Sequence, residues 1–453
     1  MKLLVYKMLL LILSPIFTDN MIFQQGRPAP VWGQASPSEY VTVTLQEEQT
    51  GIVLFKSKTK ANKDGNWKVM LPSLETGNQS LKLSVATKKE TVSCSNVAVG
   101  EVWLCSGQSN MAYEMRRSWQ APPLKGEDLA SLELKKPANP AIRVYYCGPK
   151  ERAWKIADSE SLAPISAAGY FFAKNLSDSL NVPVGIISAS LGGSSIDQWL
   201  ENGVLFQRQI LPIAPFSVSG FLWYQGETNC AMKDDKYAEK YKELTSSWRQ
   251  TFDSPDAPFY SVLLCPHTYS DRRHGFSTVT AEQLPLFWQT QISVADEIEN
   301  SEIICISDLV DNLEDIHPSY KWVVGERLAR VALAEKYGIQ GAREWSGPRA
   351  VSKRLVNGDS GSSVVVKFEH CAEGLIARAN SVEPHSNAQL KWFEIAGADG
   401  IWRPALAKIQ GVDEVSVSHP EIQNPIYVRF AWRETTQPNL FNSEGLPAFP
   451  FNL

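Results

Sequence analysis

The sequence lacks the signals of several protein classes. Its seven cysteines are scattered, with no CxxC pair and no histidine at zinc-ligand spacing, so we expect neither a metal site nor a disulfide framework. The formal net charge of −5 comes without a basic stripe, which argues against nucleic acid as a partner. Beyond the N-terminal segment, no apolar run reaches the ~18 residues that a membrane-spanning helix needs. The overall composition, 43% hydrophobic and 21% charged, is typical of a globular protein.

The N-terminal segment, MKLLVYKMLLLILSPIF, has two interpretations. Early lysines before an apolar stretch are typical of a signal peptide. However, Lys7 interrupts the stretch and no clear small-x-small cleavage site follows. We therefore favour a first β-strand over residues 9–17 and find no clear complete signal peptide.

Three regions differ in their hydrophobic pattern. Residues 1–98 alternate short apolar runs with turn signals such as KDGN, which predicts a small β-sandwich module. Residues 99–342 alternate short apolar strands with helices, which predicts an α/β domain. Residues 343–453 form a β-rich module, with strands expected at 364–368 and 426–430. The sequence does not determine the oligomeric state.

The middle region carries the strongest structural signal. Apolar strands are expected at 102–105, 184–187, 220–224 and 303–306. Helices are expected at 168–180 and 234–252, each with an apolar face; on the second, Tyr237, Tyr241, Leu244 and Trp248 share that face. Continuously apolar strands separated by helices are typical of a parallel sheet covered on both faces. Ligands of such sheets bind beyond the carboxyl ends of the strands.

Small and polar residues follow each expected strand. The first cluster is SGQSN, where Ser109 is the best candidate for a nucleophile and Gly107 permits a tight bend. Taken alone, Ser109 is more often a helix N-cap. The last cluster contains His317, the best candidate for the base among six histidines. We expect Pro318 to start a helix that runs through Val324, Leu328 and Val331.

Other residues of these clusters fit the remaining tasks of a serine hydrolase. Asp315, Glu314 or Asp308 could orient the imidazole of the base. Backbone N–H groups at Gly192-Gly193 and the side-chain amide of Gln225 suit an oxyanion hole, and Asn229 could serve likewise. We interpret Glu227 as an organiser of its loop.

Four motifs in this order resemble the sialate O-acetylesterase family of the SGNH (GDSL-like) hydrolases: WLCSGQSNM, ASLGGSSIDQW, GFLWYQGETN and DIHP. The resemblance implies a three-layer α/β/α, flavodoxin-like catalytic domain with flanking β-rich modules and no cofactor. It implies Ser109 as nucleophile, His317 as base, and oxyanion donors at Ser109, Gly193 and Gln225. Superfamily members often place the acid three residues before the histidine, which is Glu314 here; we select Asp315, and a Ser–His dyad stays an alternative. Candidate substrate-binding residues are Gln108, Asn110 and Asn229.

The predicted activity is hydrolysis of O-acetyl esters on a sugar, with sialate as the first candidate substrate. A sialate carboxylate would suit an arginine, for which the candidates are Arg116, Arg117, Arg272 and Arg273. The first alternative is an esterase that acts on acetylxylan or another neutral acetyl-sugar. The second alternative is a non-catalytic glycan-binding protein. The family resemblance implies a secreted or periplasmic location.

Overall fold

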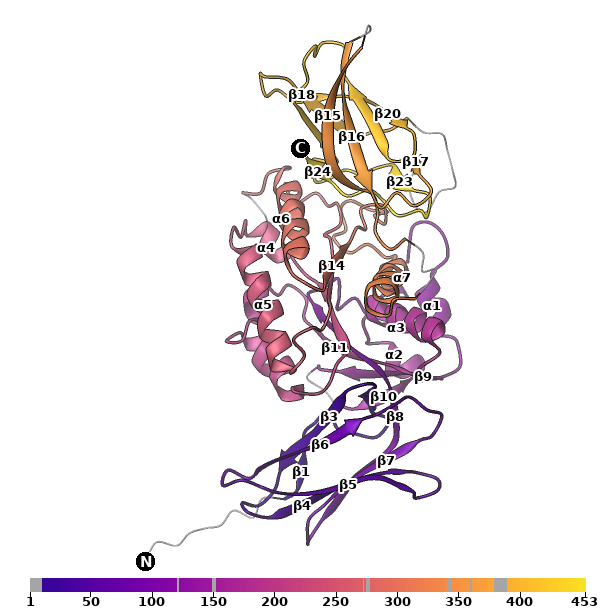
Figure 1. The fold of residues 1–453 in the computed structure, drawn as a ribbon, viewed down its shortest axis with the longest axis vertical. Coiled ribbons are helices and arrows are strands. Elements are labelled where there is room, and N and C mark those ends of the chain that lie inside the picture. Colours follow the sequence, from indigo (N-terminus) through magenta and orange to yellow (C-terminus); the bar gives the residue numbers. More distant parts are fainter. Residues whose placement is uncertain are drawn as a thin grey trace, which may run out of the picture.

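The computed structural model places an α/β region between two β-rich regions (Figure 1). It describes residues 10–119, 122–148, 152–271, 273, 278–339, 344–358, 361–378 and 389–453. The N-terminal strands lie at one end of the elongated molecule and the C-terminal strands at the other (Figure 1).

The N-terminal region contains two antiparallel groups of strands, and β2 pairs in parallel with β8. One sheet has the order β1-β3-β6, and the other joins β5, β4, β7 and β8. Buried and more exposed residues alternate along these strands. In β4, Val41, Val43 and Leu45 are buried while their neighbours are not. The first strand is shorter than predicted, and residue 9 lies outside the described residues. The strands are β1 (Ile12–Leu13), β2 (Ile22–Gln24), β3 (Pro28–Gln34), β4 (Tyr40–Glu47), β5 (Val53–Lys60), β6 (Asn66–Ser73), β7 (Leu81–Ala86) and β8 (Thr91–Gly107).

Strand β8 connects the N-terminal and central regions without a linker. Its 17 residues pair first with β7 in antiparallel fashion and then with β11 and β12 in parallel fashion. The boundary that we predicted between residues 98 and 99 therefore falls inside one strand. A single hydrophobic core runs through both regions, from Leu11 to Ala332, with Phe449 added from the C-terminal region.

The central sheet is the predicted parallel sheet. Its order is β10-β9-β11-β8-β12-β13-β14, and only the edge strand β10 pairs antiparallel along this path. Sequence patterns missed β9, β10 and β13. The strands are β9 (Asn139–Tyr146), β10 (Trp154–Ala157), β11 (Val184–Ser190), β12 (Gly220–Tyr224), β13 (Phe259–Val262) and β14 (Ser301–Ile304).

Helices lie on both sides of this sheet, with α4, α5 and α6 on one side and α1, α3 and α7 on the other (Figure 1). The predicted buried face of α5 is confirmed, since Tyr237, Tyr241, Leu244 and Trp248 are all buried. Pro318 does not start a helix, because α7 begins at Lys321. The helices are α1 (Leu129–Glu133), α2 (Ser159–Leu162), α3 (Ala167–Leu180), α4 (Glu227–Ala231), α5 (Tyr237–Thr251), α6 (Gln283–Glu297) and α7 (Lys321–Val331).

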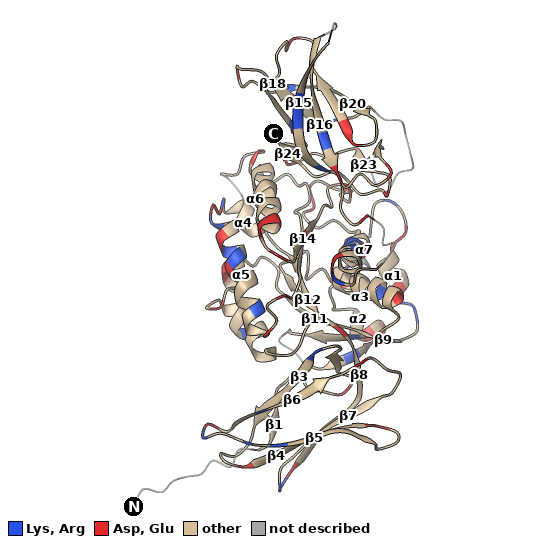
Figure 2. Cartoon of the chain, in the orientation of Figure 1, with Lys and Arg blue, Asp and Glu red and all other residues tan. Residues whose placement is uncertain are grey.

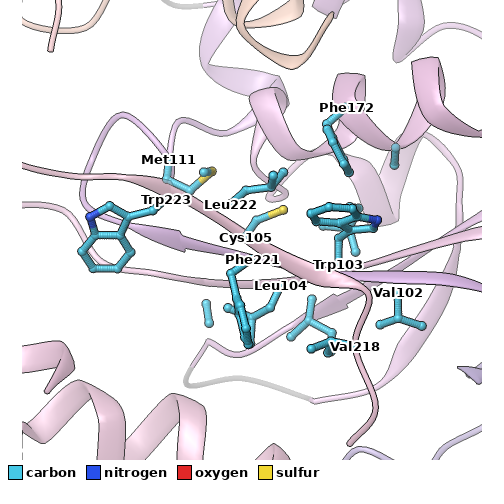
Figure 3. Close-up of a cluster of buried hydrophobic side chains, with 14 of the residues drawn as sticks. Val102, Trp103, Leu104, Cys105, Met111, Phe172, Val218, Phe221, Leu222 and Trp223 are labelled. Atoms are coloured by element: carbon cyan, nitrogen blue, oxygen red, sulfur yellow. The ribbon is translucent and has the colours of Figure 1, made fainter. Parts of the chain in front are cut away.

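Side chains of β8 pack on both sides of the strand (Figure 3). Trp103 meets Phe172 of α3 edge to face, with ring centroids 4.9 Å apart. Leu104 lies on the opposite side of the strand, near Phe221 (Figure 3). Such a filled core fixes the strand and hence the position of the residues that follow its end.

The C-terminal region has its own hydrophobic cluster, which includes Val366, Ile395 and Phe430. Strands predicted at 364–368 and 426–430 are confirmed as β16 and β22. The two main sheets have the orders β15-β16-β21-β20 and β19-β18-β22-β24. The strands are β15 (Arg349–Gly358), β16 (Gly361–Glu369), β17 (Leu375–Ala377), β18 (Phe393–Ala396), β19 (Arg403–Pro404), β20 (Leu406–Gln410), β21 (Glu414–Ser418), β22 (Tyr427–Phe430), β23 (Leu440–Asn442) and β24 (Phe451–Asn452).

Charged residues of both signs are interspersed along the chain (Figure 2). On α5, Lys240 pairs with Asp197, and Lys242 pairs with Glu297 of α6. All seven cysteines are buried free thiols. Within the part of the chain that the structure describes, no helix combines the length and apolar character needed to cross a bilayer.

Candidate active site

Three neighbouring strands end at the same level of the central sheet. Gly107 of β8 pairs with Ser190 of β11 on one side and with Tyr224 of β12 on the other. Gly107 has a φ of +136°, and a Cβ there would lie 2.1 Å from the Tyr224 carbonyl oxygen. Glycine is therefore required, and the segments that follow the three strands begin side by side.

Ser109 lies half-buried in the turn directly after β8. It does not begin a helix, since the next helical segment is the 3₁₀ turn Met115–Trp119. A Cβ on Gly192 would lie 3.5 Å from Ser109 Cβ, so the loop after β11 runs against the serine. Gly193 has a φ of +72°, a conformation that favours glycine. The loop with the expected oxyanion donor thus lies beside the expected nucleophile.

Asp315 holds His317 through two hydrogen bonds to one carboxylate oxygen. The His317 backbone N–H donates to Asp315 Oδ1 at 2.9 Å, and Nδ1 lies 3.1 Å from the same atom. The hydrogen bond with the imidazole is the main reason that the pKa of Asp315 is below its ordinary value. His317 Nε2 is buried and has no hydrogen-bond partner among the described residues. With the Nδ1 proton directed to Asp315, Nε2 presents its lone pair to the site.

The other two candidate acids are engaged elsewhere. Asp308 is buried and forms a bidentate ion pair with Arg327, with both contacts at 2.7 Å. Glu314 is 64% exposed and pairs with Arg273 at 3.1 Å. The structure therefore brings the residue at minus two, not minus three, to His317.

Arg117 lies within contact distance of the base. Its Nη2 lies 3.3 Å from His317 Nδ1, and its guanidinium lies over the Tyr113 ring at 4.9 Å. The Nδ1–H group of His317 donates to Asp315, so Nδ1 cannot accept a hydrogen bond from Arg117. The guanidinium is therefore available to another acceptor. Of the other candidates, Arg116 pairs with Glu114, Arg273 pairs with Asp271 and Glu314, and Arg272 lies outside the described residues.

Asn110 connects the segment of the nucleophile to the segment of the base. Its Nδ2 donates to the carbonyl oxygen of Ile316 at 3.0 Å. Because Ser109 precedes Asn110 and His317 follows Ile316, this bond places the two segments that carry the predicted catalytic residues side by side. Apart from this bond, the Asn110 amide also contacts Glu227 and Lys321.

Lys321 is a site residue that the sequence analysis missed. It stands on the first turn of α7, is 1% exposed, and donates to Asn110 Oδ1 at 2.6 Å. Burial lowers the pKa of Lys321 to about 7 and raises the pKa of Glu227 to about 7. A signal was available, since Lys321, Val324 and Leu328 share one helical face and that face is buried.

The three candidate substrate-binding residues, Gln108, Asn110 and Asn229, are buried and form hydrogen bonds with protein groups. Gln108 Oε1 accepts from Gln225 Nε2 and from backbone N–H groups at the start of α4. Asn229 Oδ1 accepts from Ile196 N–H and from Gln225 Nε2, and Asn229 Nδ2 donates to Asp234. Through these hydrogen bonds the three side chains hold together the loops that follow β8, β11 and β12.

Gln225, an expected oxyanion donor, also points into this network. Its Nε2 lies 2.7 Å from Asn229 Oδ1 and 3.1 Å from both Gln108 Oε1 and the Ser194 carbonyl oxygen. An amide carries only two protons, so both are already directed at protein acceptors. The described residues include no group of three or more histidine, cysteine, aspartate or glutamate side chains that could hold a metal ion.

Comparisons with known proteins agree on one family. Residues 99–334 match the family model described as carbohydrate esterase, sialic acid-specific acetylesterase. The human sialate O-acetylesterase is 26% identical over 391 residues, covering 72% of this chain and 71% of the human protein, and the mouse enzyme is 24% identical over 400 residues, covering 71% and 73%. A crystal structure of a carbohydrate acetylesterase from Xanthomonas citri matches with a TM-score of 0.83 at 28% identity, covering 98% of this chain and 99% of that one. The chain thus belongs to the sialic acid-specific acetylesterase family of carbohydrate esterases and is a carboxylic-ester hydrolase.

Proposed function

We propose that this chain removes O-acetyl groups from sialate through an acetyl-enzyme formed on Ser109, within a three-layer α/β/α SGNH-type domain. One observation carries the proposal: Asp315 holds His317 with a buried, unpartnered Nε2, beside the segment that carries Ser109. Support also comes from the family membership and from the Gly192-Gly193 loop against the serine. A secreted or periplasmic location remains a prediction from the resemblance.

The proposed reaction proceeds in two acyl transfers. His317 Nε2 accepts the Ser109 Oγ proton as Oγ attacks the acetyl carbonyl, and Asp315 stabilises the resulting imidazolium. N–H groups of Ser109 and Gly193 stabilise the oxyanion. The imidazolium then protonates the sugar oxygen that leaves. A water molecule, deprotonated by His317, attacks the acetyl carbonyl, and the imidazolium returns the proton to Ser109 Oγ as the Oγ–acyl bond breaks and acetate leaves. Gln225 would join the oxyanion hole only by turning an N–H away from its present acceptors.

Comparison of two serines at the end of β8 tests the nucleophile. Ser109→Ala should lower kcat for 4-nitrophenyl acetate by roughly 10³-fold or more, because no other group at the site replaces the attacking oxygen. Ser106→Ala is the matched control, since Ser106 is fully buried and its hydroxyl has no partner among the described residues. A fluorophosphonate probe should label wild type but not Ser109→Ala. Near-normal turnover by Ser109→Ala would refute the mechanism, and an unlabelled, inactive wild type would favour a glycan-binding protein.

Arg117 favours sialate over a neutral acetyl-sugar, because its guanidinium lies at the site and suits a carboxylate. Arg117→Met should raise KM for 9-O-acetyl sialate about tenfold or more and leave KM for acetylxylan unchanged. Arg116→Met is the control, since Arg116 is half exposed and paired with Glu114. Equal effects of Arg117→Met on both substrates would contradict sialate specificity and favour the neutral sugar.

A further inference from the structure

We propose that Lys321, Asn110 and Glu227 are positioning residues that hold the His317 loop in register with Ser109. The proposal rests on the proposed roles of Ser109 and His317. None of the three residues is expected to touch substrate, because all are buried: Asn110 is 0% exposed, Lys321 1% and Glu227 3%.

The three side chains form one continuous chain of hydrogen bonds. Lys321 Nζ donates to Asn110 Oδ1 at 2.6 Å, and Asn110 Nδ2 donates to Glu227 Oε1 at 2.5 Å. The same Nδ2 group donates to the Ile316 carbonyl oxygen at 3.0 Å. A lysine ammonium can only donate and a backbone carbonyl can only accept. The chemistry of its neighbours therefore permits a single orientation of the Asn110 amide.

This orientation matters because of where Ile316 lies. Ile316 is the residue between Asp315 and His317, so its carbonyl belongs to the peptide that connects acid and base. On the other side of the same bond, Asn110 directly follows Ser109. One amide thus ties the peptide between acid and base to the residue beside the nucleophile. Cys265 Sγ, 3.6 Å from the Ile316 oxygen, is a second and weaker anchor.

Stability alone does not account for this cluster. Burying an ammonium and a carboxylate costs several kcal/mol per ion, and apolar replacements of buried ion pairs are often neutral or stabilising. Here the lysine and the glutamate are bridged by an amide, and Glu227 Oε2 has no partner among the described residues. Lys321 also contacts the faces of Tyr113 and Tyr224, 4.9 and 5.2 Å from the ring centroids, which fix the ammonium from its other sides. Such a group directs the Asn110 amide with little freedom to move.

Replacement of both charges separates positioning from stability. Lys321→Met alone leaves Glu227 as an uncompensated buried acid, so its Tm should fall. The double variant Lys321→Met/Glu227→Gln buries no uncompensated charge and should recover most of that loss. With no ammonium on Oδ1, the Asn110 amide loses one of the partners that fix its position and can shift relative to Ile316. We therefore expect kcat for 4-nitrophenyl acetate to stay at least about tenfold below wild type in both variants, with KM changed less than about twofold.

A buried ion pair that involves another residue of α7 provides the control. Asp308→Asn/Arg327→Met removes the ion pair between Arg327 of α7 and Asp308, whose two contacts are both 2.7 Å. It should lower Tm and leave kcat near wild type. The rate of fluorophosphonate labelling of Ser109 should fall with kcat in the Lys321 variants and not in the control.

Two results would overturn the inference. One is a double variant with wild-type kcat and labelling rate, whatever its Tm; the other is a rise in KM at unchanged kcat. If Lys321→Met does not fold, the double variant alone decides. Failure of the proposed function would look different, since Ser109→Ala would then remain active or wild type would not react with the probe.

Discussion

At the scale of single residues, Asp315 has the most direct influence on the base. Its Oδ1 accepts both the backbone N–H and Nδ1–H of His317, so one carboxylate fixes the loop and the tautomer together. Asp315→Asn could present an amide N–H to Nδ1 and reverse the tautomer, so we expect kcat/KM for an aryl acetate to fall at least about a hundredfold. Glu314→Gln should change kcat/KM less than about twofold, because Glu314 is exposed and paired with Arg273. A larger loss of kcat/KM in Glu314→Gln than in Asp315→Asn would show that Glu314, three residues before His317, is the acid that orients the base.

The same carboxylate makes a prediction about acid stability. The folded protein holds the pKa of Asp315 below its ordinary value, chiefly through His317, so the folded state binds fewer protons at this group than the unfolded state. The resulting stabilisation is present above the unfolded pKa of about 3.9 and is lost as pH falls through the lower folded value. The Tm difference between wild type and Asp315→Asn should therefore shrink between about pH 6 and pH 2. A difference that stays constant over this range would contradict the linkage.

At the scale of elements, the abrupt end of β8 depends on one glycine. Gly107→Ala would place a Cβ 2.1 Å from the Tyr224 carbonyl oxygen at a φ of +136°, so neighbouring strands would have to move apart. We expect a loss of about 3 kcal/mol or more in the free energy of unfolding by urea. Gly26→Ala, at a φ of +69° with no atom within 4 Å of the new Cβ, should cost only about 1–2 kcal/mol. Similar losses in both variants would show that crowding at the strand end is not limiting.

Element patterns also show what the sequence could and could not predict. Continuous apolar runs predicted the parallel strands, and ligand sites of such sheets lie at strand ends, so Ser109 and His317 could be grouped in advance. The continuation of β8 across residue 98 could not be predicted. The strand alternates in burial while it pairs with β7, and it becomes buried on both faces where it lies between β11 and β12. The hydrogen bonds of Gln108, Asn110 and Asn229 to protein groups could not be predicted for a related reason. Residue type indicates that a side chain forms hydrogen bonds, whereas only the fold determines which groups it can reach.

At the scale of the whole molecule, the N-terminal and central regions share a core and a strand, whereas the C-terminal region has a hydrophobic cluster of its own. A chain that begins at residue 99 would cut β8 in two and remove β2, β4, β5 and β7 from its sheet. A chain that ends at residue 339 would remove the C-terminal cluster and leave β8 whole. It would lose specific contacts, such as those of Glu434 with His267 and Ser270 and of Gln437 with Val310.

The two truncations should therefore differ in kind. The chain ending at residue 339 should keep a cooperative thermal transition at a lower Tm, because its main core is intact apart from Phe449. The chain beginning at residue 99 should show no such transition and should aggregate, since half of a buried strand and its apolar partners would face water. Circular dichroism on both purified chains measures the difference. A cooperative transition near the full-length Tm for the chain beginning at residue 99 would show that the central region folds without the N-terminal half of β8.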